Sequence, residues 1–103
     1  MASSKDFLDF VLEQLSALPD IDCRAMMGEY IIYFRGRIIG GIYDNRFLVK
    51  PTANAKKIIP NAPMEIPYSG GKPMLMVTDI ENRKLLEKLF IAMYPELPDK
   101  KQK

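Results

Sequence analysis

The stretch that decides the fold is CRAMMGEYIIYFRGRIIGGIYDNRFLVK, residues 23–50. Most of its residues are β-branched, aromatic or aliphatic, and two pairs of turn formers, Arg35-Gly36 and Asp44-Asn45, interrupt it. Gly, Asn and Asp tolerate the left-handed backbone that tight hairpin turns require. The stretch therefore predicts a meander of three strands, over residues 29–34, 37–43 and 46–50. A short extended segment, residues 23–27, leads into it.

Apolar residues at steps of three and four predict helices before and after this meander. The first helix follows Ser3 or Ser4 as its cap, and Pro19 ends it. The last helix opens at the capping-box pattern of residues 78–81 and closes at Pro95. A short helix over residues 53–59 is also expected.

Two further strands are predicted over residues 64–68 and 73–77, and their prolines place the first of them at a sheet edge. The order is then α-β-β-β-α-β-β-α. It predicts an α+β fold, a two-layer sandwich of a five-stranded antiparallel sheet with helices on one face.

The composition indicates one globular domain, with 48% hydrophobic and 27% charged residues in a chain of 103. We expect the domain to span residues 1–97, followed by a charged flexible tail over residues 98–103. A net charge of +2 is small for a nucleic-acid-binding protein. No apolar run reaches the length of a membrane span, and no signal peptide is recognisable. We therefore expect a cytoplasmic protein of bacterial type that has no contact with membranes.

The residues that carry most enzyme chemistry are scarce. The chain has no His and one Cys, so we expect no catalytic residues, no metal site and no cofactor. Cys23 beside Arg24 is more typical of a small buried apolar residue than of a reactive thiol. A small-molecule or enzymatic pocket near Gly40, Gly41, Tyr43 and Tyr68 is the alternative, although turn or bulge duty is the simpler explanation of the Gly pair.

A second alternative is a single-strand nucleic-acid platform, because aromatic and basic side chains alternate along the meander. The residues concerned are Tyr30, Tyr33, Tyr43 and Phe47 with Arg35, Arg37, Arg46 and Lys50. The small net charge argues against it.

Strand alternation predicts an apolar surface on the side of the sheet away from the helices. If Phe47 and Val49 face the helices, Leu48 and Lys50 face away. Some of Ile31, Tyr33, Ile39 and Tyr43 must then share that outer side. Because an uncovered apolar patch usually marks an interface, we expect a homodimer that buries part of this face or edge.

The segment Arg24-Ala25-Met26-Met27-Gly28, then Tyr33, Gly36 and a strand ending in Lys50, resembles the TfoX N-terminal domain family, named for a bacterial competence regulator. Pro67-Tyr68 and the Met-containing strand over residues 73–76 extend the resemblance over nearly the whole chain. Met27 stands where the family usually has Phe, a tolerable exchange in a core. The chain has no room for the helical C-terminal domain of full-length TfoX regulators, so a stand-alone N-terminal domain is expected.

This resemblance implies a fold similar to that of type III secretion chaperones, frequent dimerisation and no enzymatic activity. It implies a regulatory or protein-interaction domain. The candidate interaction surface comprises Arg24, Gly28, Glu29, Tyr33, Tyr43 and Lys50. An ion pair of Glu29 with Arg24 or Lys50, joining the first strand to the third, is the simpler structural role for these charges.

Overall fold

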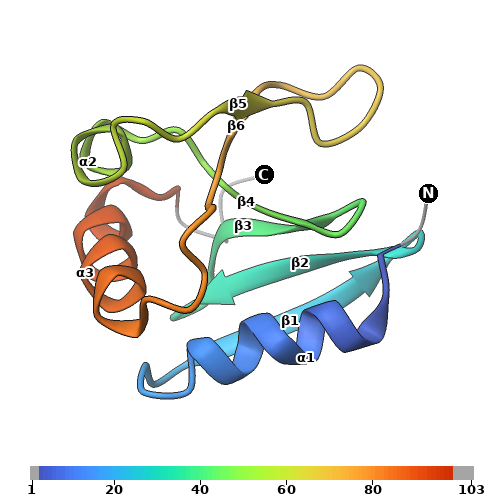
Figure 1. Ribbon diagram of the computed structural model, residues 1–103, viewed down its shortest axis with the longest axis horizontal. Helices are drawn as coiled ribbons and strands as arrows, with labels where there is room; N and C mark the ends of the chain where they lie inside the picture. Colours follow the sequence, from blue (N-terminus) through green and yellow to red (C-terminus); the bar gives the residue numbers. More distant parts are fainter. Residues whose placement is uncertain (1–2, 99–103) are drawn as a thin grey trace.

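A six-stranded antiparallel sheet, in the order β1-β2-β3-β4-β6-β5, organises the chain (Figure 1). The computed structural model describes residues 3–98. The strands are β1 Ile21–Met26, β2 Glu29–Phe34, β3 Arg37–Tyr43, β4 Arg46–Val49, β5 Met64–Glu65 and β6 Met74–Met76. The helices are α1 Lys5–Gln14, α2 Ala53–Ile58, α3 Arg83–Met93 and the 3-10 helix η1 Tyr94–Glu96.

The α+β class is confirmed, whereas the expected count of five strands is wrong. The additional strand is β1, which pairs with β2 from Ile21 opposite Phe34 to Met26 opposite Glu29. A third two-residue turn, Met27-Gly28, makes this pairing possible, because its φ angles of 53° and 87° are both positive. The predicted turns at Arg35-Gly36 and Asp44-Asn45 have the same left-handed geometry and are confirmed. Met27, expected in the core, is 96% exposed at its turn.

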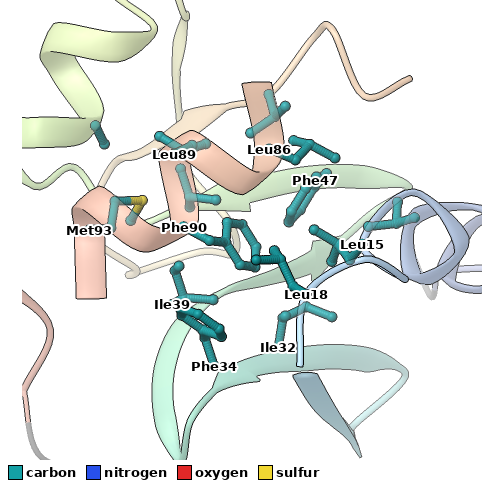
Figure 2. Close-up of a cluster of buried hydrophobic side chains, with 14 of the residues drawn as sticks. Leu15, Leu18, Ile32, Phe34, Ile39, Phe47, Leu86, Leu89, Phe90 and Met93 are labelled. Carbon is teal, nitrogen blue, oxygen red and sulfur yellow. The ribbon is translucent and has the colours of Figure 1, made fainter. Parts of the chain in front are cut away.

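The core fills the space between the helices and one face of the sheet, here called the inner face (Figure 2). Phe90 of α3 lies at its centre, with ring centroids 5.8 Å from Phe34 of β2 and 6.2 Å from Phe47 of β4. Leu15 follows α1 and is also buried. Full burial of a side chain of this size contributes about 1.5–3 kcal/mol, so these contacts fix the helices to the sheet.

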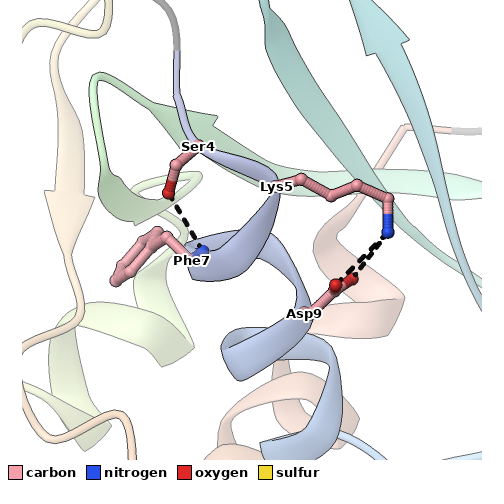
Figure 3. Close-up of polar contacts among 4 residues, drawn as sticks. All are labelled: Ser4, Lys5, Phe7 and Asp9. Carbon is pink, nitrogen blue, oxygen red and sulfur yellow. Dashed lines mark hydrogen bonds and ion pairs between the residues drawn. The ribbon is translucent and has the colours of Figure 1, made fainter.

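Helix α1 begins with a side-chain cap and ends earlier than its apolar pattern suggests. The Ser4 hydroxyl accepts a hydrogen bond from the Phe7 N–H at 3.1 Å, and Lys5 pairs with Asp9 at 3.2 Å (Figure 3). After Gln14 the chain continues as hydrogen-bonded turns to Leu18, which is still buried. The apolar residues spaced at three and four therefore continue to Leu18, beyond the end of α1 at Gln14.

The other predicted boundaries also move inward. Helix α3 starts at Arg83 with Asn82 as its cap, so the capping box expected over residues 78–81 does not open it. The strands expected over residues 64–68 and 73–77 shorten to β5 and β6, which stop short of Pro67 and begin after Pro73, because proline lacks the N–H that a ladder needs. Of the predicted tail, residues 99–103 lie outside the described residues. Among residues 3–98, no helix has the length and apolarity needed to cross a membrane.

Candidate functional site

The face of the sheet opposite the helices, here called the outer face, carries several of the predicted residues. The register places Arg24 opposite Ile31 and Asp22 opposite Tyr33, all on this face. Tyr43 and Lys50 follow it on β3 and just after β4. Ile39 does not, because a bulge between β2 and β3 turns it into the core. The outer face thus combines apolar and polar side chains, and no helix of residues 3–98 covers it (Figure 1).

The connection between β5 and β6 lies against part of the outer face. Its Tyr68 contacts Tyr43, with ring centroids 6.0 Å apart and ring planes at 55°. Leu48 is fully buried and Ile31 is 9% exposed, although both point away from the helices. This loop therefore turns the sheet surface into a recess.

The recess, here called the Lys50 cleft, has a volume of about 590 Å³. Its floor includes Ile31 and Ile38 of the sheet, and Tyr68 and Lys72 of the loop form the opposite wall. A neighbouring hollow of about 500 Å³ shares Ile31, Tyr43 and Tyr68 with it and extends to Met26, Met27 and Glu29. Met26 is 48% exposed, so the hollow opens toward the first hairpin turn.

Burial shifts the pKa values of two titratable side chains of the cleft. Desolvation lowers the pKa of the half-buried Lys50. Burial also raises the pKa of Tyr43, and the nearby Tyr68, Glu29 and Tyr33 raise it further. The Tyr43 hydroxyl lines the cleft as a phenol that can donate a hydrogen bond.

Glu29 has a structural role that the sequence did not indicate. One oxygen of its carboxylate accepts hydrogen bonds from the Ser3 hydroxyl at 2.6 Å and from the Asp44 N–H at 3.1 Å. The Ser3 hydroxyl in turn accepts from the Asn45 N–H at 3.0 Å. Together these bonds tie the start of α1 to the β3–β4 turn.

The predicted ion pair of Glu29 with Arg24 or Lys50 is wrong. The ion pairs among residues 3–98 are Lys5–Asp9, Arg46–Glu65 and Arg83–Glu13. Arg24 instead lies over the Tyr33 ring, 5.9 Å from its centroid. Gly28 supplies the left-handed end of the first turn, and its carbonyl accepts from the Ser3 N–H at 3.0 Å.

The TfoX N-terminal domain family matches residues 13–99, nearly all of the sequence. The chain belongs to the TfoX N-terminal domain family. A curated relative from Spirochaeta aurantia, described as an uncharacterized 12.7 kDa protein in the trpE 5′ region, is 30% identical over 80 residues. That match covers 78% of this chain and 70% of the relative. No solved structure matches the chain.

In this TfoX N-terminal domain, Gly40 and Gly41 allow neighbouring atoms to pack closely against the β3 backbone. A Cβ at Gly40 would overlap the Leu48 carbonyl oxygen, and one at Gly41 would lie 2.7 Å from the Tyr43 ring. The bulge expected here is confirmed next to the pair, because the register with β2 shifts between Gly40 and Ile38. Neither Gly lines the Lys50 cleft, so the pocket expected there is bounded by Tyr43 and Tyr68 without the Gly pair.

The aromatic and basic side chains of the meander do not gather on one surface of the TfoX N-terminal domain. Phe47 is fully buried in the core. The Arg37 guanidinium donates to the carbonyl oxygens of Tyr94 and Leu97 at 3.2 and 3.3 Å. Arg46 pairs with Glu65 at 2.9 Å. Arg37 and Arg46 therefore stabilise the fold through contacts within the domain.

Cys23 shows no sign of activation. Burial raises the pKa of its thiol, and the nearby Asp22 and Asp9 raise it further. Within residues 3–98, no group of three His, Cys, Asp or Glu side chains is placed to hold a metal ion.

Sequence reasoning missed Lys72 as a wall residue of the cleft. Lys72 belongs to residues 69–72, which connect the two strands predicted over residues 64–68 and 73–77. Pro67 and Pro73 flank this loop and also line the cleft. Because proline restricts the backbone, these two residues were the available signal that the loop has a defined conformation.

Proposed function

We propose that this TfoX N-terminal domain is a non-enzymatic regulatory domain that acts through protein contacts and associates with a second copy of itself. Membership of a family named for a competence regulator supports the regulatory role. The single observation that carries self-association is the edge of β1, a six-residue strand that within residues 3–98 pairs with β2 on one side only. Such an edge is a template for another strand.

The hydrogen-bonding residues of this edge follow from the pairing with β2. The Arg35 N–H donates to the Asp20 carbonyl at 2.9 Å, and the register places these two residues opposite each other. Even-numbered residues of β1 therefore direct their backbone groups toward β2. Ile21, Cys23 and Ala25 direct theirs to the free edge. The Asp22 carboxylate accepts from the Cys23 N–H at 2.8 Å, which satisfies that donor until a partner strand replaces it.

Charge selects one antiparallel register for two copies of β1. When Cys23 lies opposite Cys23 of the second copy, Asp22 of each copy lies opposite Arg24 of the other. A shift by one pair in either direction places Asp22 opposite Asp22, or Arg24 opposite Arg24. Because like charges directly opposite are destabilising, the Cys23-centred register is preferred.

Sedimentation of charge variants tests this arrangement. The unmodified chain is expected to be a dimer at micromolar concentration. Asp22→Lys and Arg24→Glu each convert two attractive cross-strand pairs into repulsive ones, which should weaken the dimer about tenfold. The double variant exchanges the charges and should restore dimerisation. A monomeric unmodified chain, or a double variant as weak as the single ones, contradicts the proposal.

Oxidation gives an independent measurement of the register. Facing residues of a hydrogen-bonded antiparallel pair have Cα atoms about 5.5 Å apart, which is compatible with a disulfide. Mild oxidation should therefore cross-link the dimer through Cys23. Cys23→Ser should abolish the cross-link and leave the sedimentation of the dimer unchanged.

A second candidate function is small-molecule binding. The Lys50 cleft favours it, because the cleft lies beside the Tyr43–Tyr68 contact where a pocket was expected. The β1 edge and the cleft use different residues, so the two functions can be tested separately.

A further inference from the structure

We propose that the Lys50 cleft binds a small organic carboxylate with an aromatic or branched aliphatic body. This inference rests on the second candidate function, small-molecule binding, and names its ligand class. It does not depend on self-association, since the cleft contains no residue of the free β1 edge. Nothing in the pairing of β1 strands requires the cleft to be occupied or empty.

The shape of the cleft suits a small molecule. Its volume of about 590 Å³ lies within the roughly 300–1,000 Å³ typical of ligand pockets. The lining includes Ile31, Ile38 and Met74, with the rings of Tyr43 and Tyr68 and three prolines. Apolar and aromatic walls with few polar groups are the usual surroundings of a bound organic ligand.

The charge of the lining specifies an anion. Lys50 and Lys72 line the cleft, and among the described residues no Asp or Glu lines it. None of the ion pairs within residues 3–98 involves Lys50. Desolvation lowers the Lys50 pKa, because burial removes part of the water that stabilises the charged ammonium. A carboxylate beside the ammonium would replace that stabilisation.

The two parts of the ligand follow from two parts of the lining. Lys50 leaves β4 next to Pro51, at the sheet side of the cleft, and is placed to pair with the carboxylate. The Tyr43 phenol also lines the cleft and can donate a second hydrogen bond. The apolar body of the ligand would lie against Ile31, Ile38 and Tyr68.

Binding of phenylacetate and of its neutral isostere phenylacetamide, followed by NMR chemical shifts, tests this assignment. Phenylacetate should shift the resonances of Lys50, Tyr68 and Gly71, whereas phenylacetamide should bind at least tenfold more weakly. Acetate, which lacks the apolar body, should also bind at least tenfold more weakly. Equal binding of acetate or of the amide overturns the proposal, and so does the absence of phenylacetate binding at millimolar concentration.

Variants at two lysines locate the site. Lys50→Met should weaken phenylacetate binding at least tenfold, and Lys50→Arg should retain most of it. The matched control is Lys57→Met, because Lys57 is exposed on α2 and does not line the cleft. Lys50→Gln replaces Lys50→Met if the latter gives an unfolded spectrum. Unchanged binding in the folded position-50 variant overturns the proposal.

The test is independent of self-association. Asp22→Lys, which should weaken the dimer, leaves the cleft intact and should bind phenylacetate as the unmodified chain does. Loss of binding in Asp22→Lys would show that the cleft depends on the dimer, contrary to the proposal. A monomeric chain that still binds phenylacetate would contradict self-association and leave the cleft assignment standing.

Discussion

At the scale of single residues, Glu29 was selected from the sequence as a charged side chain, but in the structure it stabilises the fold through hydrogen bonds. Its carboxylate joins the Ser3 hydroxyl to the Asp44 backbone, and Ser3 is itself buried. The sequence shows that Glu29 is a carboxylate next to a turn. It cannot show which donor 26 positions away reaches it, because that depends on where α1 docks.

Substitution of Glu29 separates its charge from its hydrogen bonds. Glu29→Ala leaves the Ser3 hydroxyl without its acceptor and should lower the free energy of unfolding by about 2 kcal/mol. Glu29→Gln retains a neutral acceptor and should lose about half as much. Urea denaturation measures both, with Glu81→Ala at an exposed position as the control. A Glu29→Ala variant as stable as Glu81→Ala contradicts this role.

At the scale of elements, the sequence predicts structure best where its signals are local. The two turns at Arg35-Gly36 and Asp44-Asn45 are set by neighbouring residues and were predictable. For strand β1 the sequence predicts only an extended segment, because Asp22 and Arg24 interrupt the apolar pattern and the left-handed conformation of Met27 is unusual for its residue type.

Binding features follow the same division. Tyr43 and Lys50 could be selected from the strand pattern, and the structure brings both to the cleft. The opposite wall could not be predicted, because the placement of the β5–β6 connection depends on packing between segments distant in sequence. The pairing of β4 with β6, Leu48 opposite Met76, fixes that placement.

The start of α3 gives a direct comparison of two caps. The Asn82 side chain accepts a hydrogen bond from the Leu85 N–H at 3.1 Å. Asn82→Ala should therefore lower the free energy of unfolding by about 1 kcal/mol. Thr78→Ala, at the residue that the sequence pattern selects, should change it by less than about 0.5 kcal/mol. Thermal unfolding monitored by circular dichroism measures both, and equal losses would favour a capping box at residues 78–81.

At the scale of the whole molecule, the side chains whose pKa values are shifted by burial affect stability at alkaline pH with opposite signs. The pKa values of Tyr43 and Cys23 are raised above 10.0 and 9.0, so the stability that their neutral forms contribute is lost as the pH rises through the folded-state values. The lowered Lys50 pKa acts with the opposite sign. Its charge costs stability at neutral pH, and that cost disappears as the pH rises toward 10.5 and above.

Two variants should resolve these opposing effects. Tyr43→Phe should reduce the loss of stability above about pH 10, where an unperturbed Tyr ionises. Lys50→Met should raise the free energy of unfolding of the ligand-free chain at neutral pH. The difference in stability between this variant and the unmodified chain should decrease as the pH rises. Urea denaturation across the alkaline range measures both. A Lys50→Met variant less stable than the unmodified chain at neutral pH contradicts the assigned desolvation.

The three two-residue turns also bear on the order in which the molecule folds. They allow β1 to β4 to pair through short loops, whereas β4 and β6 must close a long one around α2 and β5. We expect the folding nucleus in the meander. Ile32→Val in β2 should then slow refolding, whereas Leu75→Ala in β6 should mainly accelerate unfolding. Stopped-flow chevron plots distinguish the two, and a refolding rate that depends chiefly on Leu75 would place the nucleus at the β4–β6 closure.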